Sequence, residues 1–381
     1  MSSMIEKEVD AVSILYSLTD SYKNIAVSFS GGKDSLVALD LAVRVGIQNV
    51  VFVDTTIEFE ETKEYVNAIS DFYGIKVDVV KAPKDFFNLA GKIGFPSRRF
   101  RWCCEVFKFA PLMTYARKKD IDAYVTGLRS DESARRSRYE LIDTNPVMPI
   151  TQINPLLEWT ENDVWQYIKK YKLPINKLYN HFGRIGCWCC PYRSESDWNF
   201  IKKTYPEKMK KLEDNLVKYA ENVGIPDKHR FIKERGWTAF APPINRIIIG
   251  LCQINNDGNG KVDVTLSSGI SSQYFQKIAN LLPIITTDYE INEKQMKLKI
   301  DNQNKSRLRV LVEKSINCVN CGACIAICPQ GALYLDGESI HVDNEKCNHC
   351  CRCLHTKILR GGCIIRNYSP KRASFITKAT K

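Results

Sequence analysis

The chain has 381 residues, of which 44% are hydrophobic and 26% are charged, and its formal net charge is +12. This length exceeds what one hydrophobic core usually holds, so we expect two or three domains. No run of about 18 apolar residues is present, which excludes a membrane-spanning helix, and the polar start of the chain is unlike a signal peptide. We therefore expect a cytoplasmic protein without membrane attachment. The positive charge favours anionic partners such as nucleotides, acidic redox proteins or RNA.

Strand and helix patterns alternate along the first part of the chain. Buried strands are predicted at residues 24–30, 49–55, 75–83 and 122–128, and helices at residues 36–45 and 60–73. Thr160 is expected to cap an amphipathic helix that follows it. Because strands alternate with helices, the sequence predicts an α/β fold with a doubly wound parallel sheet.

The segment SFSGGKDS stands directly between the first predicted strand and the first predicted helix. Its two glycines let the backbone approach a phosphate with inward N–H groups, and the helix start adds partial positive charge. A lysine, an aspartate and hydroxyl groups complete the loop, and the aspartate could hold Mg²⁺ or cap the helix. The predicted nucleotide-binding residues here are Ser28, Ser30, Gly31, Gly32, Lys33, Asp34 and Ser35.

Asp54 and Thr55 end the second predicted strand. Open α/β sheets bind ligands at the carboxyl ends of their strands, so we expect both residues to contact the nucleotide. The alternative is that Asp54 only caps a turn.

Fifteen cysteines without a secretory signal favour metal ligation over disulfides. The first set consists of the pair Cys103 and Cys104 and the later group Cys187, Cys189 and Cys190. Two pairs of thiolates suit one metal centre, and zinc is satisfied by four sulfurs as well as iron is.

Several segments, taken in order, resemble the adenylyl-sulfate and phosphoadenylyl-sulfate reductase family of PP-loop proteins. They are SGGKDS, the strand ending in DT, CCEVFKFAPL, TGLRSDESARRSR, NPLLEWTENDVWQYI and RIGCWCCP, which together span about residues 20–200. The resemblance implies a Rossmann-like domain that binds adenylyl sulfate or its 3′-phosphorylated form. It also implies a 4Fe–4S cluster on Cys103, Cys104, Cys187 and Cys190, with Cys189 left over as a weak candidate nucleophile.

The same resemblance assigns the anion end of the substrate. Lys108 would lie between the cluster and the substrate anion, and Gly127 and Arg129 match the family's GLR segment. Arg136 or Arg138 would complete the pocket for the phosphate–sulfate end. We therefore expect Lys108 and Arg129 to be catalytic and Gly127 and Arg136 to contact the nucleotide.

Two features favour a different use of the nucleotide. The sequence has no Cys-Gly-Leu-His-like tail, whose cysteine attacks sulfur in this family. Its SGGKDS loop is complete, which is typical of relatives that cleave ATP between the α and β phosphates. Both features leave an ATP-dependent sulfur-inserting enzyme as the alternative.

A second cysteine set has the spacing of a two-cluster ferredoxin. Cys318, Cys321, Cys324 and Cys328 follow the C-x2-C-x2-C-x3-C-P pattern, and Cys347, Cys350 and Cys353 begin a second run. Cys363 is the expected fourth cysteine of that run, and Cys351 is spare. In ferredoxins the fourth cysteine of each run serves the other cluster. The predicted ligand sets are therefore Cys318, Cys321, Cys324 and Cys363 for one cluster, and Cys347, Cys350, Cys353 and Cys328 for the other.

The predicted domains are residues 1–235 for the nucleotide-binding domain, 236–304 for a small α+β region, and 305–381 for a ferredoxin-like domain with two 4Fe–4S clusters. We expect a reductase with three 4Fe–4S clusters that converts adenylylated sulfate to sulfite with electrons from a low-potential donor. The alternatives are an ATP-dependent sulfurtransferase acting on RNA or a small acceptor, with Mg²⁺, and a nucleotide-gated electron carrier. A homo-oligomer is expected in each case.

Overall fold

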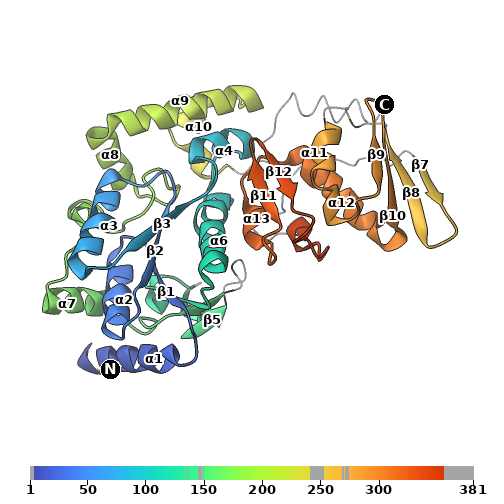
Figure 1. The fold of residues 1–381 in the computed structure, drawn as a ribbon. Helices are drawn as coiled ribbons and strands as arrows, with labels where there is room; N and C mark the ends of the chain where they lie inside the picture. The colour runs from blue at the N-terminus through green and yellow to red at the C-terminus, as the bar shows by residue number, and fades with distance from the viewer. Residues whose placement is uncertain are drawn as a thin grey trace. The chain divides into compact units, whose positions relative to one another are not determined.

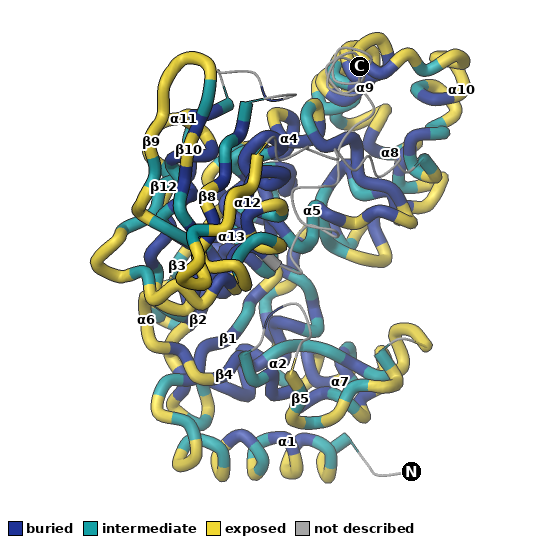
Figure 2. The backbone as a smooth tube through the Cα atoms, turned by 90° about the vertical axis from the view of Figure 1, so that its right-hand side faces the viewer, coloured by how far each residue is buried: buried dark blue, intermediate teal, exposed yellow. Residues whose placement is uncertain are grey.

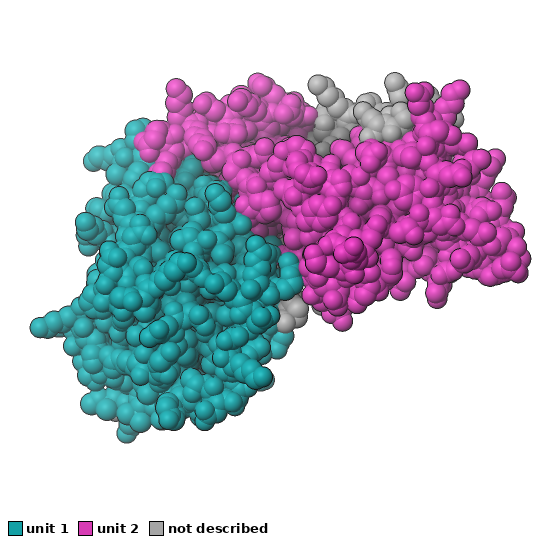
Figure 3. All heavy atoms as spheres, in the orientation of Figure 1, with its two compact units in different colours: residues 1–81, 107–206 teal, residues 82–106, 207–381 magenta. Residues whose placement is uncertain are grey.

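The computed structural model describes residues 4–134, 136–144, 148, 150–240, 253–267, 270 and 274–355. The chain forms two compact units, one of residues 1–81 and 107–206 and one of residues 82–106 and 207–381 (Figure 3). The three predicted domains divide the chain at other positions, and their boundaries stay a prediction. Cys363 lies outside the described residues.

The first unit contains a six-stranded sheet in the order β3-β2-β1-β4-β6-β5 (Figure 1). Neighbouring strands are parallel except β5, which runs antiparallel to β6. The strands are β1 (Ile25–Phe29), β2 (Asn49–Asp54), β3 (Val77–Lys81), β4 (Ala123–Val125), β5 (Ile142–Thr144) and β6 (Thr151–Ile153). The predicted α/β class is confirmed, and the strand order reverses between β1 and β4, which is where such sheets bind ligands.

Helices cover both faces of this sheet because alternate strand residues point to opposite sides. Val27 of β1 and Val50 of β2 join one apolar cluster with residues of α1, α2, α3 and α7. On the other face the hydroxyl of Tyr124 donates to the carbonyl of Leu112 in α6 at 2.7 Å. The helices of this unit are α1 (Met4–Thr19), α2 (Lys33–Arg44), α3 (Glu60–Tyr73), α6 (Ala110–Lys119), α7 (Glu161–Tyr171) and α8 (Glu195–Thr204).

The burial of each helix reflects its packing against the sheet. Nearly all of α2 is buried, whereas α1 alternates between buried and exposed residues along its length (Figure 2). The predicted N-cap of α7 is confirmed, because the hydroxyl of Thr160 accepts a hydrogen bond from the backbone N–H of Asp163 at 3.2 Å. Nζ of Lys7 lies 2.6 Å from the Asp163 carboxylate and so ties α1 to the start of α7.

The second unit combines a helical part with a small antiparallel sheet and a hairpin. The sheet has the order β7-β8-β10-β9, and β11 pairs with β12. The strands are β7 (Gln253–Asn256), β8 (Lys261–Leu266), β9 (Tyr289–Ile291), β10 (Met296–Asp301), β11 (Leu333–Asp336) and β12 (Ser339–Val342). The helices are α4 (Phe86–Ile93), α5 (Trp102–Cys104), α9 (Pro206–Val223, whose first residue falls in the first unit), α10 (Lys228–Ile232), α11 (Phe275–Ala279), α12 (Lys305–Asn317) and α13 (Ala323–Ile327).

One apolar cluster runs through the C-terminal part of this unit. It joins Val262 and Val264 of β8 with Leu308 and Leu311 of α12 and with the buried thiol of Cys324. The region before residue 305 therefore packs against the cysteine-rich region through shared apolar side chains.

Among the helices that the structure describes, none is both long enough and apolar enough to cross a lipid bilayer.

Candidate functional site

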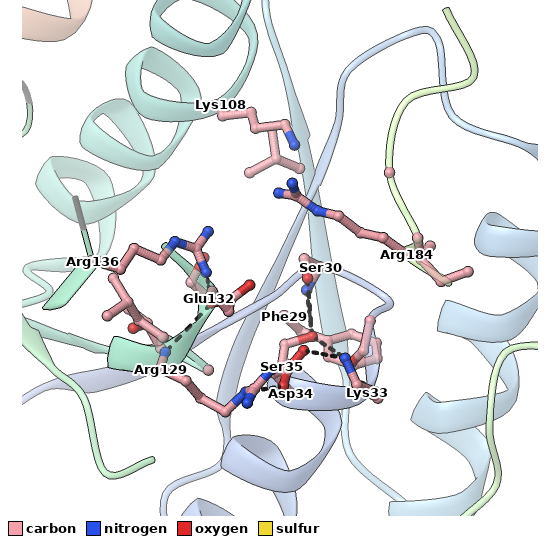
Figure 4. Close-up of a pocket in the computed structure, with 18 of the residues that line it drawn as sticks. Phe29, Ser30, Lys33, Asp34, Ser35, Lys108, Arg129, Glu132, Arg136 and Arg184 are labelled. Carbon is pink, nitrogen blue, oxygen red and sulfur yellow. Dashed lines mark hydrogen bonds and ion pairs between the residues drawn. The ribbon is translucent and has the colours of Figure 1, made fainter. Parts of the chain in front are cut away.

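A pocket of about 580 Å³ lies in the first unit where β1, β2 and β4 end (Figure 4). Most of the residues predicted to bind the substrate line it: Ser28, Ser30, Gly32, Lys33, Asp34, Ser35, Lys108, Gly127, Arg129 and Arg136. The topology brings these residues together because the loops after β1 and β4 meet at the reversal of strand order. Gly31, Asp54 and Thr55 are outside the pocket lining.

The loop between β1 and α2 is held by its own side chains. The Ser35 hydroxyl donates to the carbonyl of Gly32 at 2.9 Å and lies 3.0 Å from the Ser30 hydroxyl. Gly31 has φ +75°, and a Cβ there would lie 2.9 Å from the Thr62 side chain. Glycine is therefore required at position 31 both by backbone conformation and by the closeness of α3.

Lys33 is buried at the first turn of α2. Its Nζ lies 3.2 Å from the Asp34 carboxylate and 3.3 Å from that of Glu161. Its backbone N–H donates to the hydroxyl of Tyr179 at 2.8 Å, and burial raises the pKa of that hydroxyl. The sequence patterns did not single out Glu161 or Tyr179, because both approach the loop only through the fold.

Arg129 is buried and faces carboxylates. Its Nε donates to Asp34 at 2.7 Å, and its Nη1 donates to both oxygens of Asp131 at 2.7 Å. Asp34 forms ion pairs with Lys33 and Arg129, and its predicted contact with Mg²⁺ stays a prediction. No side-chain cap of α2 is present, since Gly32 occupies the N-cap position.

Gly127 allows the loop after β4 to lie directly on the start of α2. A Cβ at this position would come 2.4 Å from the carbonyl carbon of Asp34 and 2.5 Å from the N atom of Ser35. No side chain fits at those distances, so Gly127 sets the approach of two segments that both line the pocket.

The opposite side of the pocket is basic. Lys108 lies in a single π-helical turn, Glu105–Phe109, and π-turns of this kind are frequent at functional sites. Arg136 pairs with Glu132 one helical turn earlier in the sequence. Arg184 was not predicted, yet it lines the pocket, and Figure 4 shows its guanidinium directed toward Lys108.

Thr55 contacts a cysteine and a carboxylate. Its hydroxyl donates to Glu58 at 2.6 Å and lies 3.4 Å from the sulfur of Cys187. Asp54 accepts from the backbone N–H of Thr56 at 2.8 Å, which is the turn-capping alternative considered for it. Burial and the nearby Glu58 raise the pKa of the Cys187 thiol to about 12, although the positive charge of Lys108 opposes the shift.

The turn that carries Cys187 and Cys190 is held by a buried arginine that the sequence patterns did not single out. Arg193 donates from Nε to the carbonyl of Cys187 at 3.0 Å and from Nη2 to that of Gly186 at 2.8 Å. Its guanidinium lies 4.6 Å from the ring centre of Phe182. Cys189 is buried and outside the pocket lining, and burial raises the pKa of its thiol, so its placement does not suit a nucleophile.

The other half of the first cysteine set lies in the second unit. Cys103 and Cys104 belong to α5, and Nη2 of Arg101 donates to the Cys104 sulfur at 3.4 Å. Because the two halves belong to different units, the cluster on Cys103, Cys104, Cys187 and Cys190 stays a prediction.

The two ferredoxin-like cysteine loops repeat one backbone conformation. Asn320 and Gly322 of the first loop have φ of +59° and +78°, and His349 and Cys351 of the second have +57° and +58°. In both loops these are the second and fourth residues after the first cysteine. Alternating left-handed residues turn successive N–H groups to one side, which is a geometry common at iron–sulfur sites. The spare Cys351 therefore occupies the position of Gly322.

Cysteine burial and a hydrogen bond to sulfur in these loops are compatible with bound iron–sulfur clusters. Cys321, Cys324, Cys328 and Cys353 are buried, and the N–H of Ala332 donates to the Cys328 sulfur at 3.3 Å. Within the described part of the chain, no three His, Cys, Asp or Glu side chains converge as ligands of one ion. The assignment of individual cysteines to each cluster therefore stays a prediction.

The comparisons with known proteins match the two halves of the chain separately. The family described as phosphoadenosine phosphosulfate reductase domain matches residues 24–193, and the family described as 4Fe-4S dicluster domain matches residues 310–356. The second match supports two 4Fe–4S clusters in the C-terminal region.

The chain is also similar to individual proteins and to one solved structure. The chain is 38% identical to an uncharacterized protein of Methanocaldococcus jannaschii, over 56% of this chain and 45% of that protein. It is 31% identical to an adenosine 5'-phosphosulfate reductase of Staphylococcus haemolyticus, over 44% of this chain and 70% of that enzyme. A solved structure of the phosphoadenylyl-sulfate reductase from Candida auris in a phosphate complex is 22% identical, covers 47% of this chain and 88% of that one, and gives a TM-score of 0.40. The chain spans about half the length of the Methanocaldococcus jannaschii protein and of a second protein from that organism, of which 54% is covered.

Proposed function

The chain belongs to the phosphoadenosine phosphosulfate reductase family, and from this membership we propose that it reduces an adenylylated sulfate to sulfite with electrons delivered through its 4Fe–4S dicluster domain. The observation that carries the proposal is the pocket of the first unit. It joins the loop Ser28–Ser35, which suits phosphates, to the cationic side chains of Lys108, Arg136 and Arg184. A nucleotide that carries a second anionic group beyond its α phosphate could contact both the phosphate loop and these cationic side chains.

The reaction balances with two electrons. The bond between sulfur and the oxygen that bridges it to the α phosphate breaks, and its electron pair leaves on that oxygen, while the two donated electrons become the lone pair of sulfur and reduce it from S(VI) to S(IV). The bridging oxygen leaves with AMP, or with the 3′-phosphorylated nucleotide, and sulfur becomes sulfite. A low-potential donor supplies the two electrons one at a time through the dicluster domain, because each 4Fe–4S cluster carries one electron.

We propose a third 4Fe–4S cluster on Cys103, Cys104, Cys187 and Cys190. Four cysteines as two close pairs provide the required thiolates, and two features of the first unit support the fit. The turn at Cys187 and Cys190 is braced by hydrogen bonds from Arg193, and the positive charge of Lys108 opposes the rise in the pKa of the Cys187 thiol that burial and Glu58 cause. Zinc is the competing occupant, since four sulfurs suit it equally.

A second candidate function is ATP-dependent sulfur transfer to RNA or a small acceptor, with Mg²⁺. It is favoured by the complete SGGKDS loop and by the net charge of +12. In that reaction the loop would hold a pyrophosphate leaving group and the nucleotide would activate the acceptor.

One experiment distinguishes the reductase function from ATP-dependent sulfur transfer. Anaerobically purified and reduced protein is incubated with adenylyl sulfate, with its 3′-phosphorylated form, or with ATP, and the products are analysed. The reductase proposal expects sulfite from an adenylylated sulfate, and the second candidate expects AMP and pyrophosphate from ATP with an acceptor present. The Cys321→Ser and Cys350→Ser variants should lose sulfite formation driven by the low-potential donor, because each removes a predicted ligand of the dicluster domain.

A further inference from the structure

The charged residues of the pocket pair with one another on its phosphate-loop side. Lys33 contacts Asp34 and Glu161, and Arg129 contacts Asp34 and Asp131. Arg136 pairs with Glu132, and the remaining pocket carboxylate, Glu58, accepts from Thr55. Every carboxylate that lines the pocket therefore already has a donor. Arg184 also lines the pocket, and among the described residues none forms an ion pair with it.

Arg184 is held over the pocket by a short segment that is fixed at both ends. On one side Phe182 is buried and packs against Phe59, with ring centres 5.3 Å apart. On the other side the carbonyl of Gly186 accepts from Arg193 at 2.8 Å. The four residues Gly183–Gly186 between these anchors all line the pocket. The backbone that carries Arg184 is thus held in place before any ligand binds, which lowers the entropy cost of bringing its guanidinium to an anion.

Arg184 and Lys108 converge on one space. Their side chains reach from opposite sides of the pocket toward each other (Figure 4). Two cations that converge in a concave site repel unless an anion lies between them. A planar guanidinium also matches the oxygen pairs of a tetrahedral anion.

We propose that Arg184 binds the terminal tetrahedral anion of the nucleotide, the sulfate of an adenylylated sulfate, across the pocket from Lys108. This inference rests on the proposed function for the identity of the anion. The family resemblance gave the phosphate–sulfate end of the pocket to Arg136 or Arg138. We assign the sulfate to Arg184 because Glu132 pairs with Arg136, and Asp34 and Asp131 bind Arg129. This assignment also places the sulfate at the end of the pocket near Cys187, since Gly186, the residue before it, lines the pocket with Arg184.

Binding of matched ligands tests the assignment. Calorimetry on the full-length holoprotein compares AMP, adenylyl sulfate and ATP for the natural chain and for Arg184→Ala, Arg184→Lys and Lys177→Ala. Lys177 is exposed and outside the pocket lining, so it serves as the charge control. Arg184→Ala should lower the affinity for adenylyl sulfate about 10- to 100-fold, because one charge-assisted contact to the sulfate is lost. The affinity for AMP should change less than about twofold. Arg184→Lys should fall between, since lysine keeps the charge without the planar fork.

Three results for Arg184→Ala would overturn the assignment: an equal loss of affinity for AMP and adenylyl sulfate, no loss of affinity for either, or a loss of affinity confined to ATP. The product assay on the natural chain separates this inference from the proposed function. Sulfite formation together with unchanged adenylyl-sulfate binding by Arg184→Ala would remove only the Arg184 assignment. A selective loss of adenylyl-sulfate binding in a protein that makes no sulfite would remove only the reductase activity.

Discussion

Nε of Arg129 donates a 2.7 Å hydrogen bond to Asp34, a residue 95 positions earlier in the chain. The contact joins the loop after β4 to the first turn of α2. Nη1 of the same guanidinium binds Asp131, so one buried cation is shared by two carboxylates. We infer from this arrangement that Arg129 positions the phosphate loop, and its catalytic role stays a prediction.

Arg129→Ala should destabilise the first unit. It leaves Asp34 and Asp131 without their shared cation, and a hydrogen bond to a charged group contributes about 1.5–3 kcal/mol. Thermal and urea unfolding of the full chain measure the change, with the exposed Arg138→Ala as control. If Arg129→Ala kept the unfolding midpoint and lost only nucleotide binding, Arg129 would be a ligand contact after all.

Lys33→Ala should weaken binding of adenylyl sulfate or ATP by about 1.5–3 kcal/mol, the contribution of a hydrogen bond to a charged group. Lys33 is buried with its ammonium beside Asp34 and Glu161, so a phosphate would replace these carboxylates as its partner. Calorimetry gives the affinity, and Lys169→Ala on the exposed surface of α7 is the control. Unchanged affinity would exclude the loop lysine from the site.

Gly127→Ala should both destabilise the protein and lower nucleotide affinity. The added Cβ would meet the backbone of Asp34 at 2.4 Å, which forces the two pocket-lining loops apart. Overpacking of this kind costs about 1–3 kcal/mol. Gly91→Ala is the matched control, because it lies within α4 and its Cβ would have no atom within 4 Å, so it should be neutral or stabilising. A Gly127→Ala protein with the natural unfolding midpoint would contradict the close approach.

Iron analysis tests the third cluster. Three 4Fe–4S clusters predict about twelve iron atoms per anaerobically purified chain, and Cys187→Ser should leave about eight. Cys189→Ser is the control, because Cys189 is buried and has no place in the predicted ligand set. About eight iron atoms together with bound zinc in the natural protein would make the Cys103, Cys104, Cys187 and Cys190 centre a zinc site.

The left-handed backbone at Cys351 gives a prediction for the dicluster domain. Cys351→Gly should keep its clusters, since Gly322 has the same conformation at the matching position of the first loop. Cys351→Val keeps a buried side chain of similar size, but a β-branched residue at φ +58° is strained by about 1–3 kcal/mol. Thermal melting followed by the visible absorption of the clusters should therefore show a lower midpoint for Val than for Gly. Equal midpoints would mean that backbone strain at residue 351 is unimportant.

Features that depend on neighbouring residues could be predicted from the amino-acid sequence alone. Alternating strands and helices predicted the α/β class, and the loop at Ser30–Ser35 was recognisable because a phosphate loop is a local arrangement of backbone N–H groups. The ferredoxin-like spacing was equally readable, since short intervals between cysteines are set by turn geometry. Thr160 was predicted correctly as an N-cap for the same reason.

The pairing of charges in the pocket, in contrast, depends on contacts between residues far apart in the sequence. Tyr179 meets Lys33 across 146 positions of sequence, and Arg129 meets Asp34 across 95. Asp54 and Thr55 contact a turn and Cys187, partners that the sequence did not indicate, and their contact with the nucleotide stays a prediction. Such pairs depend on which residues are buried together when helices pack on a sheet. Residue type and spacing along the chain do not predict these long-range pairs. For the same reason, no sequence pattern indicated a role for Arg184 or Arg193. Whether an arginine binds an anion or stabilises a turn depends on the groups that the fold places around its guanidinium.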